Sequence, residues 1–387
     1  MVMTPTELIA LCARAHAHPR FTANLRQAVE QFTAWEELPA LAETHGMAPL
    51  LYQHLRAVEA PWPTTVQLAL KGLVLRHQRA APIYDRVLRE VLQHLATAGL
   101  EALVLKGSAL AHLIYPQPSL RPRRDLDILV QMQDAERAYQ MLAEVGFSLA
   151  PSSLHGLSRH HQHLAPVERD VAGLTVTLDL HVNLFFRFKA YGLPQVNYNE
   201  LKRHAIPFNV DGFTASTLSP EAMLWHLYHH GFSAPPRVAS QDRGRLLGAA
   251  DIVSLVEQWY SRLDWERVRR CYPQVFHALP MFHFLTPWSD AVLEHLHLKV
   301  DRRPSGVGEV YAGYPAQWWR EHVRRGLRRS LRETFWPSEW WVRMYYGWPE
   351  PRSVHLGRLK HAGLVVWDLA LYATSLLGPL KVHPYDN

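Results

Sequence analysis

Cysteine is scarce in this sequence of 387 residues. Only Cys12 and Cys271 occur, and they lie far apart along the chain. Two such residues cannot build a disulfide framework or a cysteine-based zinc site. Their scarcity fits a reducing compartment, and we expect a cytoplasmic protein.

Long apolar runs are also lacking. The longest, residues 362–377, is interrupted by Asp368 and is shorter and more polar than a bilayer span requires. We therefore predict a buried helix there and no transmembrane segment. The N-terminus lacks the basic and apolar regions of a signal peptide, and no internal repeat stands out.

The chain is too long for one small core, so two or three domains are expected. A hydrophobic content of 48% with 20% charged residues is ordinary for a folded protein. The formal charge of +6 favours anionic partners such as nucleotides, nucleic acid or a membrane surface, without choosing among them.

The most informative stretch runs from residue 102 to residue 130. An apolar run ends in Lys106-Gly107-Ser108, and a helix-like segment and a basic loop follow. Asp125-Leu126-Asp127 then opens a second apolar run. Residues i and i+2 of a strand point to the same face, so Asp125 and Asp127 would project side by side. Two such carboxylates are costly without a cation, and Mg²⁺ takes oxygen ligands while leaving positions for phosphate.

Gly107 and Ser108 stand at a strand-to-helix junction, where backbone N–H groups and a hydroxyl can receive phosphate oxygens. Lys106 and Arg121 are candidates for neutralising phosphate charge, although each could be an ordinary surface charge. Either motif alone is common by chance, and it is their order along the chain that indicates a phosphoryl-transfer site.

This order resembles the DNA polymerase β-like nucleotidyltransferase superfamily. It resembles more closely an uncharacterised bacterial nucleotidyltransferase family that carries the motifs LKG, R and DIDLLV. The matching residues are Leu105-Lys106-Gly107, Arg121 and the run DLDILV at 125–130. The spacer of 16 residues between Ser108 and Asp125 is longer than in compact members of the superfamily.

A third acidic residue is expected on a neighbouring strand. In the segment LTVTLDLH, residues 174–181, strand alternation places Asp179 and His181 on the face opposite the leucines. The resemblance implies that Asp179 is the third metal-binding carboxylate and helps to deprotonate the attacking hydroxyl. A solvent-facing Asp179 on an edge strand is the alternative.

We predict an α+β fold, with a mixed sheet flanked by helices as in the polymerase β-like core. This core would span residues 85–215, between an N-terminal helical region, 1–84, and a C-terminal helical domain, 216–387. His181 and Asp251 are candidate pocket residues, and Asp251 could equally form a structural ion pair.

Two further segments carry open alternatives. Histidines crowd residues 155–163, which indicates either metal ligands or a solvated loop at a pocket rim. Residues 317–348 are rich in Arg and Trp, with arginines every four residues from Arg320 to Arg332. They could contact nucleic acid, lie on an anionic membrane surface, or form a solvated helix face.

The resemblance implies Mg²⁺-dependent transfer of a nucleoside monophosphate from an NTP such as ATP to a hydroxyl or phosphate acceptor, with release of pyrophosphate. Two Mg²⁺ ions, with Mn²⁺ as a substitute, would bind Asp125, Asp127 and Asp179. Three alternatives stay open. They are a tailoring enzyme with a nucleotide-sugar donor, a toxin-like enzyme acting on tRNA or protein, and a non-catalytic nucleotide-binding module.

Overall fold

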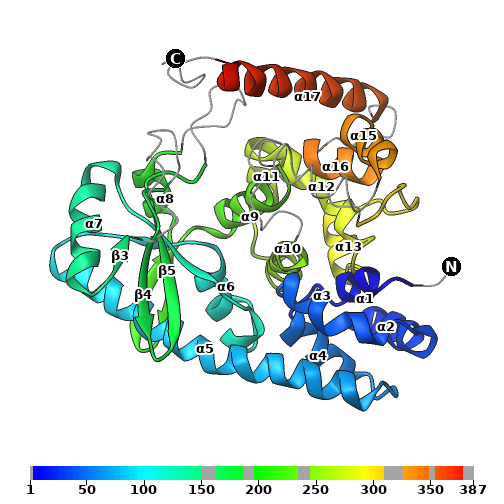
Figure 1. The fold of residues 1–387 in the computed structure, drawn as a ribbon, viewed down its shortest axis with the longest axis horizontal. Coiled ribbons are helices and arrows are strands. Elements are labelled where there is room, and N and C mark those ends of the chain that lie inside the picture. Colours follow the sequence, from blue (N-terminus) through cyan, green and yellow to red (C-terminus); the bar gives the residue numbers. More distant parts are fainter. Residues whose placement is uncertain are drawn as a thin grey trace. The chain divides into compact units, whose positions relative to one another are not determined.

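The computed structural model describes residues 3–149, 163–185, 196–233, 245–308, 326–347 and 354–377 (Figure 1). Within these ranges, no helix combines the length and the apolar character needed to cross a membrane. The chain divides into two compact units. The sheet unit comprises Ala15–Ala17 and Thr33–His226, and the helical unit comprises Met1–Arg14, His18–Phe32 and Leu227–Asn387.

The sheet unit contains a seven-stranded mixed sheet in the order β3-β4-β5-β2-β1-β7-β6. Its strands are β1 (Leu103–Val104), β2 (Asp125–Leu129), β3 (Ser148–Leu149), β4 (Val167–Val171), β5 (Leu174–His181), β6 (Ile206–Val210) and β7 (Phe213–Thr217). β2 runs parallel to β5 and β1 runs parallel to β7, while the other neighbours are antiparallel. The predicted α+β fold with a mixed sheet is confirmed.

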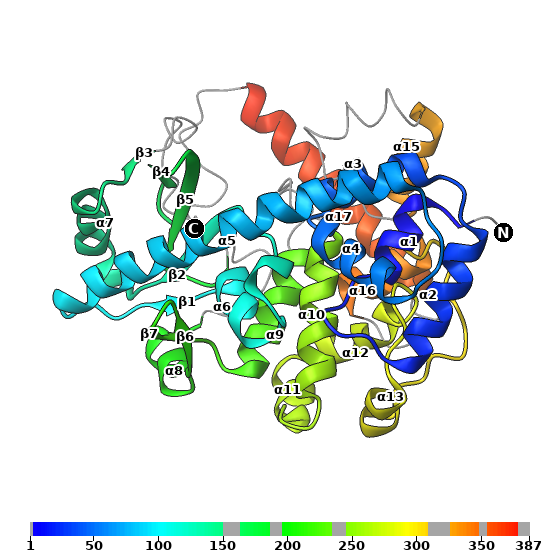
Figure 2. The same ribbon diagram turned by 90° about the horizontal axis from the view of Figure 1, so that it is seen from below.

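Helices flank this sheet, as Figure 2 shows for α5 and α6. The α-helices of the unit are α3 (Leu38–Thr44), α4 (Ala48–Ala57), α5 (Thr64–Thr97), α6 (Lys106–Leu113), α7 (Ala135–Glu144) and α8 (Tyr198–Arg203). Short 3₁₀ turns occur at Trp35–Glu37, Pro118–Leu120 and Met132–Asp134. α5 is continuous across residues 84 and 85, where the sequence suggested a domain boundary, and α3 to α5 group with the sheet.

The alternation of β5 turns the apolar side chains of Val176, Leu178 and Leu180 into the core, where each is fully buried. The intervening residues therefore share the opposite face, and Asp179 is half-buried on it. Because successive side chains of β5 point to opposite faces, Asp179 lies on the polar face while its neighbours pack into the core.

β1 is the shortest central strand and joins the two halves of the sheet. It pairs with β2 on one side and with β7 on the other. The Thr217 hydroxyl donates to the Val104 carbonyl at 2.5 Å, and the Leu105 N–H donates to the Asp127 carbonyl at 2.9 Å. These bonds fix the chain immediately before α6 begins.

The helical unit gathers both ends of the chain. Its helices are α1 (Pro5–Leu11), α2 (Pro19–Gln31), α10 (Leu246–Trp259), α11 (Trp265–Cys271), α12 (Pro273–Phe282), α13 (Asp290–Leu296), α15 (Leu327–Phe335), α16 (Glu339–Tyr346) and α17 (Val354–Leu377). α9 (Pro220–Tyr228) spans the division between the units, and a π-helical turn follows at His229–Ser233. The fully buried Arg14 pairs with Glu257 at 2.7 Å and donates to the Pro287 carbonyl.

The apolar tract predicted as a buried helix lies within α17. It is helical, but α17 is buried along only one side: His361 and Val365 are fully buried, while Val366 is 57% exposed. The N-terminal part of the same helix exposes Leu356 and Leu359. Within 362–377, Val365 is buried whereas Val366 and Trp367 are exposed, so the prediction of a buried helix is wrong for the described part of the tract.

His361 joins three helices of the helical unit and makes their packing sensitive to pH. Its Nε2–H donates to the Thr334 carbonyl at 2.8 Å, and its Nδ1 accepts from the Tyr346 hydroxyl at 3.2 Å. Both bonds use the neutral ring, and burial lowers the pKa of His361 to about 4. An unfolded histidine titrates near pH 6.5. The stabilisation is therefore complete above this pH and is lost as pH falls toward 4.

We predict that the free energy of unfolding of the helical unit decreases between pH 6.5 and pH 4, by up to about 3 kcal/mol from His361. Chemical denaturation across this range, followed by tryptophan fluorescence, measures the slope. His361→Gln should flatten it, whereas His355→Gln, a histidine of the same helix that is exposed, should leave it unchanged. Equal slopes for wild type and His361→Gln would contradict the assignment.

Candidate active site

The site begins where α6 starts, directly after β1. Lys106, the first residue of α6, has a left-handed backbone with a φ of 47°. This conformation is unfavourable for a residue with a side chain and persists only where the surroundings enforce it. Here it directs the Lys106 ammonium toward the sheet, where Nζ lies 2.9 Å from Asp127 Oδ1.

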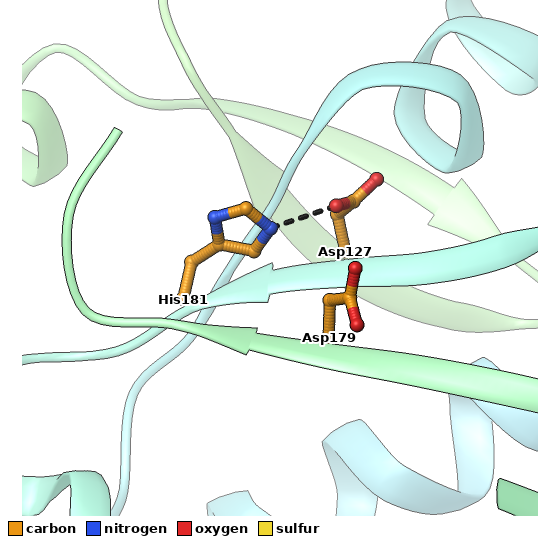
Figure 3. A group of neighbouring side chains, drawn as sticks. All are labelled: Asp127, Asp179 and His181. Atoms are coloured by element: carbon orange, nitrogen blue, oxygen red, sulfur yellow. Dashed lines mark hydrogen bonds and ion pairs between the residues drawn. The ribbon is translucent and has the colours of Figure 1, made fainter. Parts of the chain in front are cut away.

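The parallel pairing of β2 and β5 brings two predicted carboxylates together. Asp127 is the direct register partner of Asp179, and Leu129 is that of His181. Oxygen or nitrogen atoms of Asp127, Asp179 and His181 all lie within 4.8 Å of one another (Figure 3). Asp179, placed by the sequence on a neighbouring strand, thus lies beside Asp127. This group is suited to hold a divalent metal ion.

Charge balance explains how Asp127 tolerates its position. It is 4% exposed, and burial alone would keep it protonated. Against this burial, the Lys106 ammonium and the His181 hydrogen bond hold the pKa of Asp127 well below its ordinary value. Burial likewise opposes the charge on Lys106, but the carboxylates of Asp127, Asp125 and Asp179 raise its pKa. The buried pair is therefore ionised at neutral pH.

His181 is fully buried and lies between Asp127 and a second histidine. Its Nε2 is 2.7 Å from Asp127 Oδ1, the oxygen that also meets Lys106. The His163 ring lies 5.3 Å from the His181 ring, centroid to centroid, and Leu164 N–H donates to the Leu180 carbonyl. Burial lowers the pKa values of both rings, that of His163 to about 4, so both are neutral at pH 7.

Arg121 covers the glycine of the predicted phosphate cradle. A Cβ atom placed on Gly107 would lie 1.9 Å from Arg121 Nη1, so only glycine admits the guanidinium at this distance. Gly107 and Ser108 are both buried, and the Ser108 hydroxyl has no hydrogen-bond partner among the described residues. The sequence named Lys106 and Arg121 as candidate phosphate-binding cations beside Gly107 and Ser108, and the structure places the Arg121 guanidinium over Gly107.

Asp125 is separate from the group of three. It is half-buried at the start of β2, opposite Thr177. Its negative charge acts on Lys106 and, after burial, helps to raise the pKa of Tyr84 to about 12. Among the described residues, the third member of the metal-suited group is therefore His181, where the sequence had predicted Asp125.

Other candidates lie elsewhere. Asp251 is buried on α10, in the helical unit, so its pocket role stays a prediction. Of the histidines crowded at 155–163, only His163 falls in the described part of the chain, and Arg320 and Arg324 fall outside it.

One buried cluster beside the site was not foreseen from the sequence. Arg123 pairs with Asp85 at 2.6 Å, and His112 lies 2.9 Å from the same carboxylate oxygen. Arg123 also donates to the Ala81 carbonyl and lies over the Tyr84 ring. This cluster anchors the basic loop before β2 to α5, and so fixes the strand that carries Asp125 and Asp127. The basic run RPRR was its only signal in the sequence.

These features, a mixed sheet with two acidic residues on adjacent parallel strands and a cationic strand-to-helix corner, agree with the family comparison. Residues 32–273, more than half of the chain, match the model of a family described as uncharacterised nucleotidyltransferase. The chain therefore belongs to this family of nucleotidyltransferases, as the sequence motifs had suggested. No curated protein matches it.

Two solved structures show distant similarity. The solution structure of the antibiotic-resistance factor ANT(2″)-Ia is 12% identical, with a TM-score of 0.35, over 52% of this chain and 98% of its own. The crystal structure of an antigenic nucleotidyltransferase-like protein from Paracoccidioides brasiliensis is 15% identical, with a TM-score of 0.30, over 56% of this chain and 96% of its own. Similarity this low carries no conclusion about the present chain.

The contact between Gly107 and Arg121 gives a test that separates folding from function. Gly107→Ala should displace the guanidinium at little cost to stability, because the clashing group is the far end of a flexible side chain. Alanine also favours the helix by roughly 0.5–1 kcal/mol over glycine. We expect an unchanged or higher melting temperature and at least tenfold weaker binding of a fluorescent NTP analogue.

Gly72→Ala is the matched control. Gly72 is exposed within α5 of the same unit, and a Cβ there would meet nothing within 4 Å. This variant should gain the same helix propensity and leave nucleotide binding unchanged. Equal nucleotide affinities for the two alanine variants would show that Arg121 has no part in binding.

Proposed function

We propose that this protein transfers a nucleoside monophosphate from an NTP, such as ATP, to a hydroxyl or phosphate acceptor and releases pyrophosphate. Membership in the nucleotidyltransferase family supports the general activity. The observation that carries the proposal is the parallel register that sets Asp127 against Asp179, with the Lys106 ammonium on Asp127. This arrangement pairs a site for a cation with a positive charge for phosphate.

The residues at hand fit a divalent metal, because Asp127, Asp179 and His181 offer three ligand atoms within 4.8 Å of one another. Mg²⁺, two ions as expected from the sequence or Mn²⁺ in their place, would lower the charge repulsion between phosphates and carboxylates and polarise the transferred phosphoryl group. Asp125, which lies two residues before Asp127 on β2, would be a ligand of the second ion.

Other steps of the reaction would depend on the protein's side chains, which accept the proton and bind the phosphates. Asp179 would accept the proton of an attacking hydroxyl, since it is less buried than Asp127 and lies beside it. Arg121 and Lys106 would bind the β- and γ-phosphates, with Gly107 allowing the close approach and the buried Ser108 hydroxyl completing the corner. Positioning and charge dominate phosphoryl transfer, so no covalent intermediate with the protein is required.

We further propose a cytoplasmic location and a peripheral contact of the segment from Arg320 to Arg332 with an anionic surface. Of its arginines, Arg328 and Arg332 have described side chains, and both are exposed. Exposed arginines on one short helix give a positive potential that weakly attracts phosphate-bearing partners.

Removing the charge of Asp127 tests the proposal directly. We predict that Asp127→Asn lowers the transfer of label from α-labelled NTP at least about a hundredfold, the effect typical of losing one transition-state electrostatic contact. Cell extract supplies the acceptor, and the appearance of label on RNA, protein or a small molecule identifies its class. Asp170→Asn, an exposed carboxylate on β4, is the control and should keep full activity. Full activity in Asp127→Asn would overturn the assignment.

We predict that the Lys106 ammonium and a divalent metal ion compete for the Asp127 carboxylate. Lys106→Met leaves Asp127 as a buried charge without its ammonium partner, which costs about 3 kcal/mol of stability. A divalent ion then restores more stability in the variant than in wild type, because no lysine has to be displaced. We expect a lower melting temperature without metal, a larger metal-induced rise in melting temperature, and weaker NTP binding.

Lys202→Met provides the matched control, since Lys202 forms an exposed ion pair with Glu101 in the same unit. Exposed pairs contribute roughly 0–1 kcal/mol, so its melting temperature and metal response should stay near those of wild type. A metal response of Lys106→Met no larger than that of wild type would show that the ammonium and the metal do not share Asp127.

A further inference from the structure

We propose that His181 is a nitrogen ligand in the metal site, and that it makes the site prefer a first-row transition ion such as Mn²⁺ over Mg²⁺. This inference rests on the proposed metal-dependent function and specifies which ion serves it. The sequence had indicated His181 only as a candidate pocket residue, whereas this inference makes it a metal ligand.

The geometry places the imidazole where a ligand must be. A ring nitrogen of His181 and a carboxylate oxygen from each of Asp127 and Asp179 lie within 4.8 Å of one another. Two ligands of one ion, each at about 2.0–2.2 Å from it, lie up to about 4.4 Å apart. A shift of a few tenths of an ångström is therefore enough for all three to share one ion.

The hydrogen bond between His181 and Asp127 marks the position that the cation would take. Nε2 and Oδ1 are 2.7 Å apart and share one hydrogen bond, which the neutral imidazole donates to the carboxylate (Figure 3). When this proton moves to Nδ1 or to solvent, both atoms present lone pairs to the same point. His181 cannot turn away easily, because it is fully buried at the end of β5 and its backbone carbonyl accepts from Val130 N–H at 3.0 Å.

The chemistry of the donors then determines the choice of ion. Mg²⁺ binds through oxygen ligands and keeps most of its water. Imidazole nitrogen favours transition ions, whereas carboxylate oxygens accept Mn²⁺ and Mg²⁺ alike. A site with two carboxylates and one imidazole therefore binds Mn²⁺ more tightly than Mg²⁺. A site of three carboxylates, as expected from the sequence, would lack this discrimination.

Pulsed electron paramagnetic resonance on the full chain with one equivalent of Mn²⁺ tests the ligand directly. A bound imidazole produces a nitrogen coupling in the spin-echo modulation, and protein grown with ¹⁵N-histidine must shift it to the ¹⁵N pattern. We expect both results for wild type, and loss of the coupling in His181→Asn. The isotope shift shows that the ligand is a histidine, and the loss of the coupling in His181→Asn assigns it to His181.

Calorimetric titrations supply the second readout. His181→Asn should bind Mn²⁺ at least tenfold more weakly than wild type, with Mg²⁺ affinity changed less than threefold. His204→Asn is the control, since His204 is exposed after α8 in the same unit, and it should match wild type.

Mn²⁺ bound without a nitrogen coupling, or a coupling that persists in His181→Asn, would overturn the role of His181 while leaving the proposed function intact. Absence of binding by either ion, with or without NTP, would overturn both.

Discussion

A single carboxylate oxygen, Asp127 Oδ1, receives two buried nitrogen groups, and the site is built around it. Lys106 reaches it from the start of α6 and His181 from the end of β5. Without these two contacts, a charge so well shielded from water would be neutralised by protonation. The left-handed backbone of Lys106, the register between β2 and β5, and the buried apolar face of β5 all serve to bring three segments to that one atom.

The sequence predicted much of this arrangement, for identifiable reasons. The alternation at 174–181 indicated a strand with Asp179 and His181 on one face, because that pattern is local. The apolar runs before Lys106 and after Asp125 indicated central strands in the same way. The pairing of Asp127 with Asp179 depends on which strands become neighbours, and only the family resemblance suggested it.

Other features could not be read from the sequence because they depend on distant contacts. The pairing of Arg123 with Asp85 depends on how α5 packs under the basic loop, some forty residues away in sequence. Arg121 covers Gly107 because the 3₁₀ turn at Pro118–Leu120 folds back over α6, which no local pattern specifies. That His181 joins Asp127 and Asp179 in the metal-suited group likewise depends on the pairing of β2 with β5.

The two-residue strand β1 has a mechanical consequence for the sheet unit. It is the narrow bridge between β3-β4-β5-β2 on one side and β7-β6 on the other, and Lys106 lies two residues beyond its end. Few register pairs cross this bridge: two join β1 to β2, and one joins β1 to β7. Lys106 follows β1, and Asp127 lies on β2, so the joint between β1 and β2 is the one that holds them together. The Lys106–Asp127 ion pair thus depends on a ladder of only two residue pairs.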